Sequence, residues 1–406
     1  MLIVKTPDEV REIINAHLLS CKSNDVLSFE TVKTLDALWR VLHQDIIANE
    51  NIPGFNRSTV DGYAVLSSDT FGCSESIPAV LTVKGEVLMG ESADCQPEPG
   101  TCMIVSTGGE VPDGADAVVM HEFTEDFGTG MVGIQKPAAP GNNIIYYNDD
   151  SSAGDLVLPA GTVISPHDVG IISALGYSDV EVCCKPVVGV ISTGDELVQV
   201  SAVLKSGQVR DVNTPMLLAA MADIGAASKD YGIIPDDSKA IRNAMLSAVE
   251  SCDIVLLSGG SSAGVHDMTA RIIEAEGELL FHGIAMKPGK PTILGVVKDK
   301  LIFGLPGHPV AAFMVTELFV KPLVFCFMGA ELKRKTTMAI LSEPISSNHG
   351  REEYVLVRLD SESGLATPIR SKSGLIASMA GIDGYICIAR DNEGLAKGTE
   401  VIVFYF

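Results

Sequence analysis

The stretch VVGVISTGDE, residues 187–196, decides the fold, because an apolar run rich in β-branched residues ends there in a polar loop. Further runs that predict strands lie at 253–258, 279–285, 292–297 and 301–305. Helical patterns alternate with these strands at 215–224, 237–250, 267–276 and 309–320. Strands that alternate with helices form parallel sheets with helices on both faces, so residues 186–325 predict an α/β domain.

The segments on either side of this domain have other patterns. Thr6-Pro7-Asp8-Glu9 combines a cap, a proline and first-turn acids, which predicts a helix over the residues that follow. A second helix is expected at 34–42. Residues 49–147 alternate short apolar runs with Gly- and Pro-rich turns, which predicts a β-rich insertion. Residues 330–406 have the same character and predict a small β-barrel or sandwich.

Composition limits the class of protein. A chain of 406 residues, 46% of them hydrophobic, has room for roughly two to four domains. Its formal net charge of −23 argues against a nucleic-acid partner. An anionic substrate is compatible with that charge, because exposed charges are screened beyond about 8 Å and a few basic groups can dominate a pocket. We expect no membrane partner, since no secretory signal is visible and the apolar runs are too short to span a bilayer.

Cysteine and histidine usage gives no sign of a metal or disulfide framework. The nine cysteines form no CxxC pair, and the eight histidines form no HExxH pattern. We therefore expect a reduced, cytoplasmic compartment.

Four loops of the α/β segment follow predicted strands, and ligands bind at the carboxyl ends of such strands. The loop 192–196 places Ser192, Thr193 and Glu196 after a buried strand, and hydroxyl and carboxylate oxygens suit Mg²⁺. The alternative is a helix cap with a solvated acid. In SGGSSAGVHD, residues 258–267, backbone N–H groups can approach an anion and a helix is expected near Asp267. The alternative there is a flexible turn.

The other two loops add charge and rigidity. MKPGKP, residues 286–291, presents Lys287 and Lys290 in a chain that has only 29 basic residues. Lysine is a point-charge partner for phosphate or another oxyanion, and a solvated turn is the alternative. In LPGHPV, residues 305–310, Pro309 suits the first position of a helix and is expected to leave free N–H groups facing the loop. His308 can contact ligand or act as a cap or surface residue.

Several acids have simpler local explanations. Asp236 and Asp237 open a predicted helix, and Asp237 is expected to cap it. Asn213 is expected to cap the helix that begins near Pro215. Asp61 and Asp150 lie in turn-like sequence and by themselves suggest only turns.

The motifs taken together resemble the molybdopterin molybdenumtransferases, the family of bacterial MoeA and the gephyrin E domain. The resemblance covers nearly the whole chain, in order. It is carried by IPGFNRSTVDGYAV (52–65), STGGEVPDGADAVV (106–119), STGDEL (192–197), DVNTPML (211–217), GIIPDD (232–237), SGGSSAGVHD (258–267), MKPGKP (286–291) and GLPGHPVA (304–311).

The resemblance implies a homodimer of multidomain α/β subunits. It implies a parallel-sheet α/β pterin-binding domain, a mixed helical/β unit, a β-rich insertion and a C-terminal β-barrel. The corresponding boundaries are 183–328, 1–48 with 148–182, 49–147 and 329–406. It also implies that Asp61 of one subunit faces the α/β site of the other.

The resemblance assigns roles to residues that match the family motifs. The implied catalytic residues are Asp61, Glu196, Asp236, Asp267 and Lys287. The implied metal ligands are Glu196, Asp236 and Asp267. The implied substrate-binding residues are Thr107, Asp150, Ser192, Thr193, Gly259, Gly260, Ser262, Lys290, Pro306, Pro309, Arg351 and Ser373. The chain departs from the usual pattern at His308, Ala311, His282, Asn148 and the pair Ser261-Ser262, most of which concern the expected oxyanion pocket.

The implied reaction is the insertion of molybdate into adenylylated molybdopterin, with Mg²⁺ as cofactor and release of AMP. The resemblance also implies transient contact with the pterin adenylyltransferase that supplies the substrate. Two alternatives remain open at this stage. One is a dimeric scaffold with a vestigial site, and the other is an enzyme more like the adenylyltransferase itself.

Overall fold

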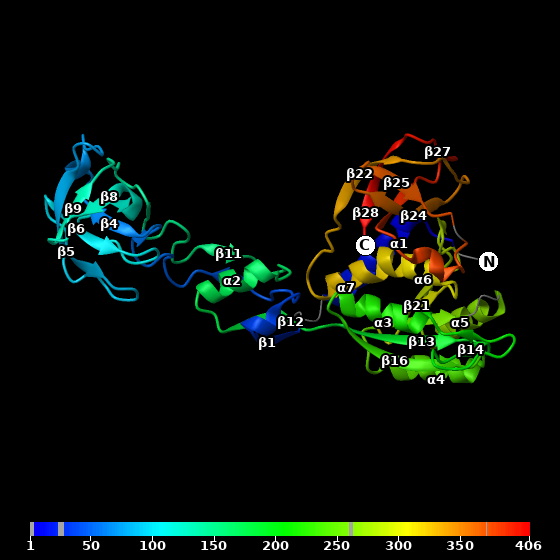
Figure 1. The fold of residues 1–406 in the computed structure, drawn as a ribbon. Coiled ribbons are helices and arrows are strands. Elements are labelled where there is room, and N and C mark those ends of the chain that lie inside the picture. The colour runs from blue at the N-terminus through cyan, green and yellow to red at the C-terminus, as the bar shows by residue number, and fades with distance from the viewer. Residues whose placement is uncertain (1–3, 23–27, 260–262, 371) are drawn as a thin grey trace. The chain divides into compact units, whose positions relative to one another are not determined.

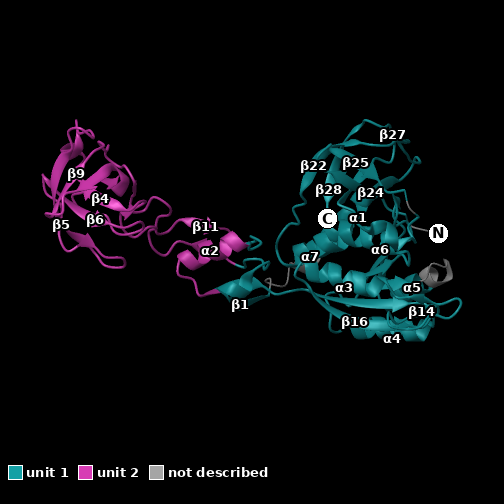
Figure 2. Cartoon of the chain, in the orientation of Figure 1, with its two compact units in different colours: residues 1–43, 161–165, 180–406 teal, residues 44–160, 166–179 magenta. Residues whose placement is uncertain are grey.

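The computed structural model describes residues 4–22, 28–259, 263–370 and 372–406. The chain divides into two compact units (Figure 2). The first unit comprises residues 1–43, 161–165 and 180–406, and the second comprises 44–160 and 166–179. This division into two units is coarser than the four predicted domains, so the predicted domain boundaries stay a prediction.

The second unit is built around a six-stranded sheet. Its strands, in spatial order, are β7 (Ala117–Met120), β4 (Gly62–Val65), β6 (Thr101–Val105), β5 (Ala79–Val87), β9 (Met131–Ile134) and β8 (Thr124–Asp126). In β4, Tyr63 and Val65 belong to one core cluster and Ala64 to another, so both faces of this curled sheet are covered. Gly62 is required here, because an added Cβ would lie 2.0 Å from the Val119 carbonyl oxygen. The predicted β-rich insertion is confirmed.

The remaining elements of this unit are short. β2 (Ile46–Ile47) pairs with β11 (Leu156–Leu158), and β3 (Arg57–Ser58) pairs with β10 (Ile144–Ile145). The 3-10 turns are η2 (Ser67–Thr70) and η3 (His121–Phe123), and α2 spans Pro166–Ala174. Ladders of two or three residues bury little apolar surface, so these segments have no large core of their own.

The first unit contains the predicted α/β domain. Its sheet has the order β16 (Ala227–Ile234), β13 (Val187–Thr193), β17 (Ile254–Gly259), β21 (Lys300–Leu305), β20 (Ile293–Val297) and β18 (Glu278–His282). The first four strands are parallel, as predicted. At the edge, however, β20 runs antiparallel to β21 and to β18. The cause is a two-residue hairpin in which Lys298 and Asp299 both have positive φ.

Helices cover both faces of this sheet, as predicted (Figure 1). α3 (Asn213–Asp223) packs with one core cluster, whose strand residues include Val188, Val190 and Leu256. α4 (Ser238–Val249) and α5 (Ala263–Glu276) pack with the opposite cluster, which includes Ile191 and Val255. The backbone of α5 begins four residues before Asp267, earlier than the expected start.

One long helical segment packs in the core of the first unit. It comprises α6 (Pro309–Val315), the π-helical segment η4 (Thr316–Val320) and α7 (Lys321–Phe327). Residues Pro309–Phe327 are long and apolar enough to cross a membrane by length and composition, which corrects the expectation that no run was long enough. The segment is nevertheless 72% buried within the protein. It also carries a buried ion pair between Glu317 and Lys321, 2.5 Å apart, which suits a protein core better than lipid.

The C-terminal segment forms a closed five-stranded barrel, which decides between the two architectures left open by the sequence. Its strands are β24 (Glu352–Asp360), β25 (Leu365–Pro368), β22 (Thr336–Leu341), β28 (Glu400–Tyr405) and β26 (Gly384–Ile388). Pairing of β24 with β26 closes the ring. The short strands β23 (Ile345–Ser346) and β27 (Gly394–Leu395) pair beside it, and η5 spans Ile376–Met379.

The N-terminal segment confirms one helix and contradicts another. The first predicted helix is α1 (Pro7–Lys22), which buries Val10, Ile14 and Leu18 in the core of the first unit. The helix expected at 34–42 is wrong, since only the 3-10 turn η1 (Thr34–Ala37) forms. Trp39 has a φ of +61°, a conformation that ends helical propagation. β1 (Phe29–Lys33) and β12 (Asp179–Cys183) form a two-stranded sheet beside this turn.

Candidate active site

Two cavities lie at the strand ends of the first unit. We call the larger the basic pocket, with a volume of about 850 Å³. The smaller, of about 610 Å³, lies at the ends of β13 and β17 and is called the strand-end pocket. Both are lined by His308, which places them side by side.

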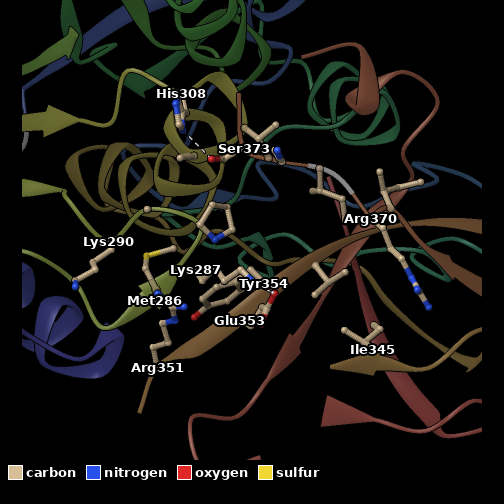
Figure 3. Close-up of a pocket in the computed structure, with 18 of the residues that line it drawn as sticks. Met286, Lys287, Lys290, His308, Ile345, Arg351, Glu353, Tyr354, Arg370 and Ser373 are labelled. Atoms are coloured by element: carbon tan, nitrogen blue, oxygen red, sulfur yellow. Dashed lines mark hydrogen bonds and ion pairs between the residues drawn. The ribbon is translucent and has the colours of Figure 1, made fainter. Parts of the chain in front are cut away.

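The basic pocket gathers cations in an acidic protein (Figure 3). Its basic side chains are Lys287, Lys290, Arg351, Arg370 and Lys372. Glu353 is the one carboxylate among the described residues that line it. The chain as a whole has a net charge of −23, so this pocket is a local reversal of sign. Such a concentration of cations raises the local concentration of anions.

Backbone pairing carries the lysine loop onto the barrel. β19 (Met286–Lys287) adds a parallel strand to the edge of β24, with Lys287 opposite Glu353. The Glu352 N–H also donates to the carbonyl oxygen of Ala285 at 3.0 Å. The predicted lysines and Arg351 therefore line one cavity although they are about 60 residues apart in sequence.

The cations of the pocket differ in how they are paired. Lys287 Nζ lies 2.5 Å from Glu353 Oε1, so its charge is already neutralised in part. Arg370 pairs with Glu343 at 3.2 Å. Within the described part of the chain, Lys290 and Arg351 make no side-chain hydrogen bond or ion pair. These two are the cations most available to a ligand.

His308 and Ser373 connect the barrel to the start of α6. His308 Nδ1 lies 2.8 Å from Ser373 Oγ, and the Val310 N–H donates to the Ser373 carbonyl oxygen at 3.2 Å. The N–H groups of Ala311 and Ala312 both donate to the His308 carbonyl oxygen at 3.0 Å. The expectation of free N–H groups at this helix start is therefore wrong, because these three donors are occupied. Pro306 lines the basic pocket and Pro309 the strand-end pocket.

The strand-end pocket contains several of the predicted polar residues. Thr193, Glu196 and Gly259 line it, together with Pro309. Gly259 has no room for a side chain, since an added Cβ would lie 2.1 Å from Thr193 Oγ1. Ser192 lines neither pocket, because it is only 1% exposed and its Oγ lies 2.8 Å from Thr214 Oγ1. Ser192 thus supports the loop from behind.

Asp211 and Asn213 also line this pocket, although the sequence suggested only a cap at this point. The Asp211 carboxylate accepts hydrogen bonds from the Asn213 and Thr214 N–H groups, both at 3.1 Å. Asp211 therefore supplies the cap that was expected from Asn213. The Asn213 amide instead donates to Ser258 Oγ at 2.7 Å and to the Gly307 carbonyl oxygen at 2.9 Å. It joins the start of α3 to the end of β17 and to the loop that follows β21.

Glu196 lines this pocket and has two acidic neighbours, Asp195 and Asp236, which line neither pocket. The Asp236 N–H donates to Asp195 Oδ1 at 3.2 Å. Burial, and then the charges of Asp195 and Glu196, raise the pKa of the Asp236 carboxyl. One oxygen of Asp236, Oδ1, is buried without a hydrogen-bond partner. Asp237 caps α4, as predicted, by accepting from the N–H groups of Lys239 and Ala240.

These acids fit a magnesium ion that is completed by substrate. Among the described side chains there is no ready-made group of three ligands for a metal. Mg²⁺ is commonly held by one or two carboxylates together with phosphate and water, which Glu196 and Asp236 can provide. Like-charged neighbours and an unpartnered buried oxygen on Asp236 also favour a cation here. The predicted residues Gly260 and Ser262, and the side chain of Asp267, lie outside the described residues.

The remaining predicted residues lie in the second unit. Antiparallel pairing of β4 with β6 brings Asp61 next to Thr107, whose N–H donates to Asp61 Oδ1 at 2.8 Å. This hydrogen bond, together with the Thr107 side chain, lowers the pKa of Asp61. Both residues are exposed, as is Asp150. Asp61 is thus held as an anion on the surface of its own unit.

Fold and site define a multidomain α/β protein with an anion pocket beside an acid-lined pocket. Residues 5–176 match a family model described as the MoeA N-terminal region (domain I and II). Residues 189–325 match a probable molybdopterin binding domain, and residues 338–406 match the MoeA C-terminal region (domain IV).

Full-length relatives agree with these matches. The molybdopterin molybdenumtransferase of Bacillus subtilis is 32% identical over 411 residues, covering 99% of this chain and 95% of that protein. A putative molybdopterin biosynthesis protein of Methanocaldococcus jannaschii is 33% identical over 384 residues, covering 92% and 91%. The crystal structure of a molybdopterin biosynthesis MoeA protein from Pyrococcus horikoshii has a TM-score of 0.86 at 33% identity, covering 99% and 100%. The chain belongs to the MoeA family of molybdopterin molybdenumtransferases, enzymes of molybdenum cofactor biosynthesis.

Proposed function

We propose that this chain inserts molybdate into adenylylated molybdopterin in the cytoplasm, releases AMP and yields molybdenum cofactor. The observation that carries the proposal is the juxtaposition of the basic pocket and the strand-end pocket around His308. One pocket suits a free oxyanion, and the other suits a phosphate beside a divalent cation. A reaction that joins an oxyanion to a phosphorylated pterin needs both.

The basic pocket is proposed to hold molybdate. Of the cations that line this pocket, Arg351 and Lys290 make no hydrogen bond or ion pair with the described residues, and Lys287 adds a third charge that it shares with Glu353. Ser373 Oγ lies at the same pocket, fixed by His308, and can donate or accept a hydrogen bond. Point charges and a hydroxyl suit a tetrahedral dianion.

The strand-end pocket is proposed to hold the phosphoanhydride of the adenylylated pterin. Thr193 and the end of β17, Ser258 and Gly259, line the cavity, and Glu196 and Asp236 would hold Mg²⁺. When bound, the ion would neutralise phosphate charge and stabilise AMP as it leaves. Asn213 holds the end of β17 and the loop after β21, which line the pocket. Positioning and charge neutralisation account for catalysis without a nucleophile from the protein.

The assembly is proposed to be a homodimer in which the partner subunit's Asp61 completes this site. The support is the family membership of the chain and the geometry around Asp61, where Thr107 holds an exposed carboxylate in its charged form. Transient contact with the pterin adenylyltransferase that makes the substrate is part of the same proposal.

One assay tests the proposed function. Purified protein is incubated with adenylylated molybdopterin, Mg²⁺ and either molybdate or tungstate, and AMP and reconstituted cofactor are measured. Oxyanion-dependent AMP release together with cofactor formation is expected. Consumption of ATP with unadenylylated pterin would instead indicate an adenylyltransferase. A dimer that releases no AMP would indicate a scaffold.

A further inference from the structure

A carboxylate inside an anion pocket is the feature of the site that the proposed function does not use. Glu353 is only 8% exposed, and both of its oxygens are bonded. Oε1 lies 2.5 Å from Lys287 Nζ, and Oε2 accepts a hydrogen bond from Ser347 Oγ at 2.8 Å. Figure 3 shows Glu353 beside Lys287 in the pocket.

The ion pair is not needed to place the lysine loop, because backbone bonds already do so. β19 pairs with β24 at two positions, Met286 with Glu352 and Lys287 with Glu353. The bond from the Glu352 N–H to the Ala285 carbonyl oxygen extends this ladder. A neutral residue at position 353 would leave these contacts in place, so the charge of Glu353 has another consequence.

That consequence is competition with the ligand. A negative charge a few ångströms from the anion site repels an entering oxyanion, and the carboxylate also occupies the Lys287 ammonium. An oxyanion that takes a hydrogen bond from Lys287 must weaken the bond to Glu353. Affinity is thereby held below what the cations of the pocket would give without that carboxylate.

We propose that Glu353 is a resident counter-anion that competes with the bound oxyanion for Lys287 and so keeps it transferable. This inference rests on the proposed function, because it takes the basic pocket as the molybdate site. An oxyanion that is to be passed to the pterin must not be trapped in its first binding site. Tighter binding of the ground state lowers KM without raising kcat. Glu353 acts through Lys287 and is therefore a positioning residue.

The test is a molybdate titration of the full-length protein by calorimetry, comparing wild type with Glu353→Gln. Glutamine keeps the shape and an acceptor oxygen and removes only the charge. We expect molybdate to bind roughly tenfold more tightly, while single-turnover cofactor formation at saturating molybdate stays level or falls. Equal or weaker binding in a variant with wild-type thermal stability would overturn the inference.

Two further variants make the result specific. Glu362→Gln removes the same charge from an exposed position of the same barrel outside the pocket, and we expect less than about a twofold change. Ser347→Ala removes a hydrogen bond to Glu353 and concentrates the carboxylate charge on Lys287, so molybdate affinity should fall about two- to threefold. Unchanged affinity in Ser347→Ala would contradict the inference even if Glu353→Gln failed to fold.

Failure of this inference can be told apart from failure of the proposed function. If the wild-type protein binds no molybdate at millimolar concentration, the assignment of the pocket itself is wrong. If wild type binds molybdate and Glu353→Gln does not bind it more tightly, only the role of Glu353 is wrong.

Discussion

The basic pocket and the strand-end pocket share His308 but are built in opposite ways. The basic pocket takes its charges from side chains that reach in from the lysine loop and the barrel, and several of these side chains are exposed. The strand-end pocket is shaped by bonded groups, among them Ser192, Asn213 and Asp211, that fix loops at the ends of parallel strands. The comparison teaches that one pocket is tuned by charge and the other by rigidity. Substitutions in the two should therefore fail in different ways.

The largest expected effect is a loss of AMP release while molybdate binding is retained, which would separate the roles of the two pockets. Glu196→Gln removes a proposed magnesium ligand, and AMP release should fall by about 10²- to 10³-fold, since a metal ion supplies several kcal/mol of charge stabilisation. Molybdate affinity should stay within about twofold in a calorimetric titration, because the substitution lies outside the basic pocket. Glu274→Gln, an exposed position on α5 in the same domain, is the matched control and should retain activity. Loss of molybdate binding in Glu196→Gln would show that the pockets are not separate.

The next effect lies in the basic pocket. Lys287→Ala removes a cation and leaves Glu353 unpaired beside the ligand, so molybdate affinity should fall by roughly 100-fold. Adding Glu353→Gln to this variant should restore about 50-fold, more than the tenfold gain expected in the wild-type background, because the carboxylate that has lost Lys287 repels the oxyanion more strongly; a double-mutant cycle measures that coupling. Lys397→Ala, at an exposed barrel position outside the pocket, serves as control. Strict additivity of the two substitutions would contradict the shared bond.

A smaller effect concerns the rigidity of the strand-end pocket. Asn213→Ala removes hydrogen bonds to Ser258 and to the Gly307 carbonyl oxygen, which should lower the free energy of unfolding by about 1–2 kcal/mol. AMP release should fall with little change in molybdate binding. Differential scanning calorimetry measures the first, with Asn243→Ala on the exposed side of α4 as control. A variant with unchanged stability and activity would show that the two Asn213 hydrogen bonds are not needed to hold this pocket in shape.

The smallest effect is a pH dependence of stability. Burial and neighbouring acids raise the folded-state pKa of Asp236, so the folded chain holds that proton more tightly than the unfolded chain does. Rising pH through the folded-state pKa therefore costs stability. Asp236→Asn should be slightly more stable at pH 7, by less than about 1 kcal/mol for a half-buried group. The gain should disappear as pH falls toward the ordinary aspartate pKa of 3.8. An equal gain at every pH would contradict the assigned cause.

The sequence predicted the parts of the fold that repeat a strong local pattern. The apolar runs that became β13, β17 and β21 were recognisable because they are buried on both faces. The edge strand β16 was missed because Lys229 and Asp230 give it a polar pattern. The helix expected at 34–42 does not form, because Trp39 has a positive φ. The residues around Trp39 do not indicate that conformation, so the prediction was wrong.

Site residues that belong to a local sequence motif could be predicted from the sequence. Residues that reach the site through the pairing of distant strands could not. MKPGKP identified Lys287 and Lys290, which do line the basic pocket. Glu353 was missed, although it lies two residues after Arg351 and therefore on the same face at the start of β24. Its bond to Lys287 depends on the pairing of β19 with β24, two strands that are far apart in the chain. No local pattern encodes such a contact.

The most direct test of the central claim is single-turnover AMP release as a function of molybdate concentration. Purified protein is loaded with adenylylated molybdopterin and Mg²⁺, and molybdate is then added. If an oxyanion in the basic pocket drives chemistry in the strand-end pocket, AMP appears only with molybdate, together with stoichiometric cofactor. AMP release at the same rate without molybdate would contradict the account.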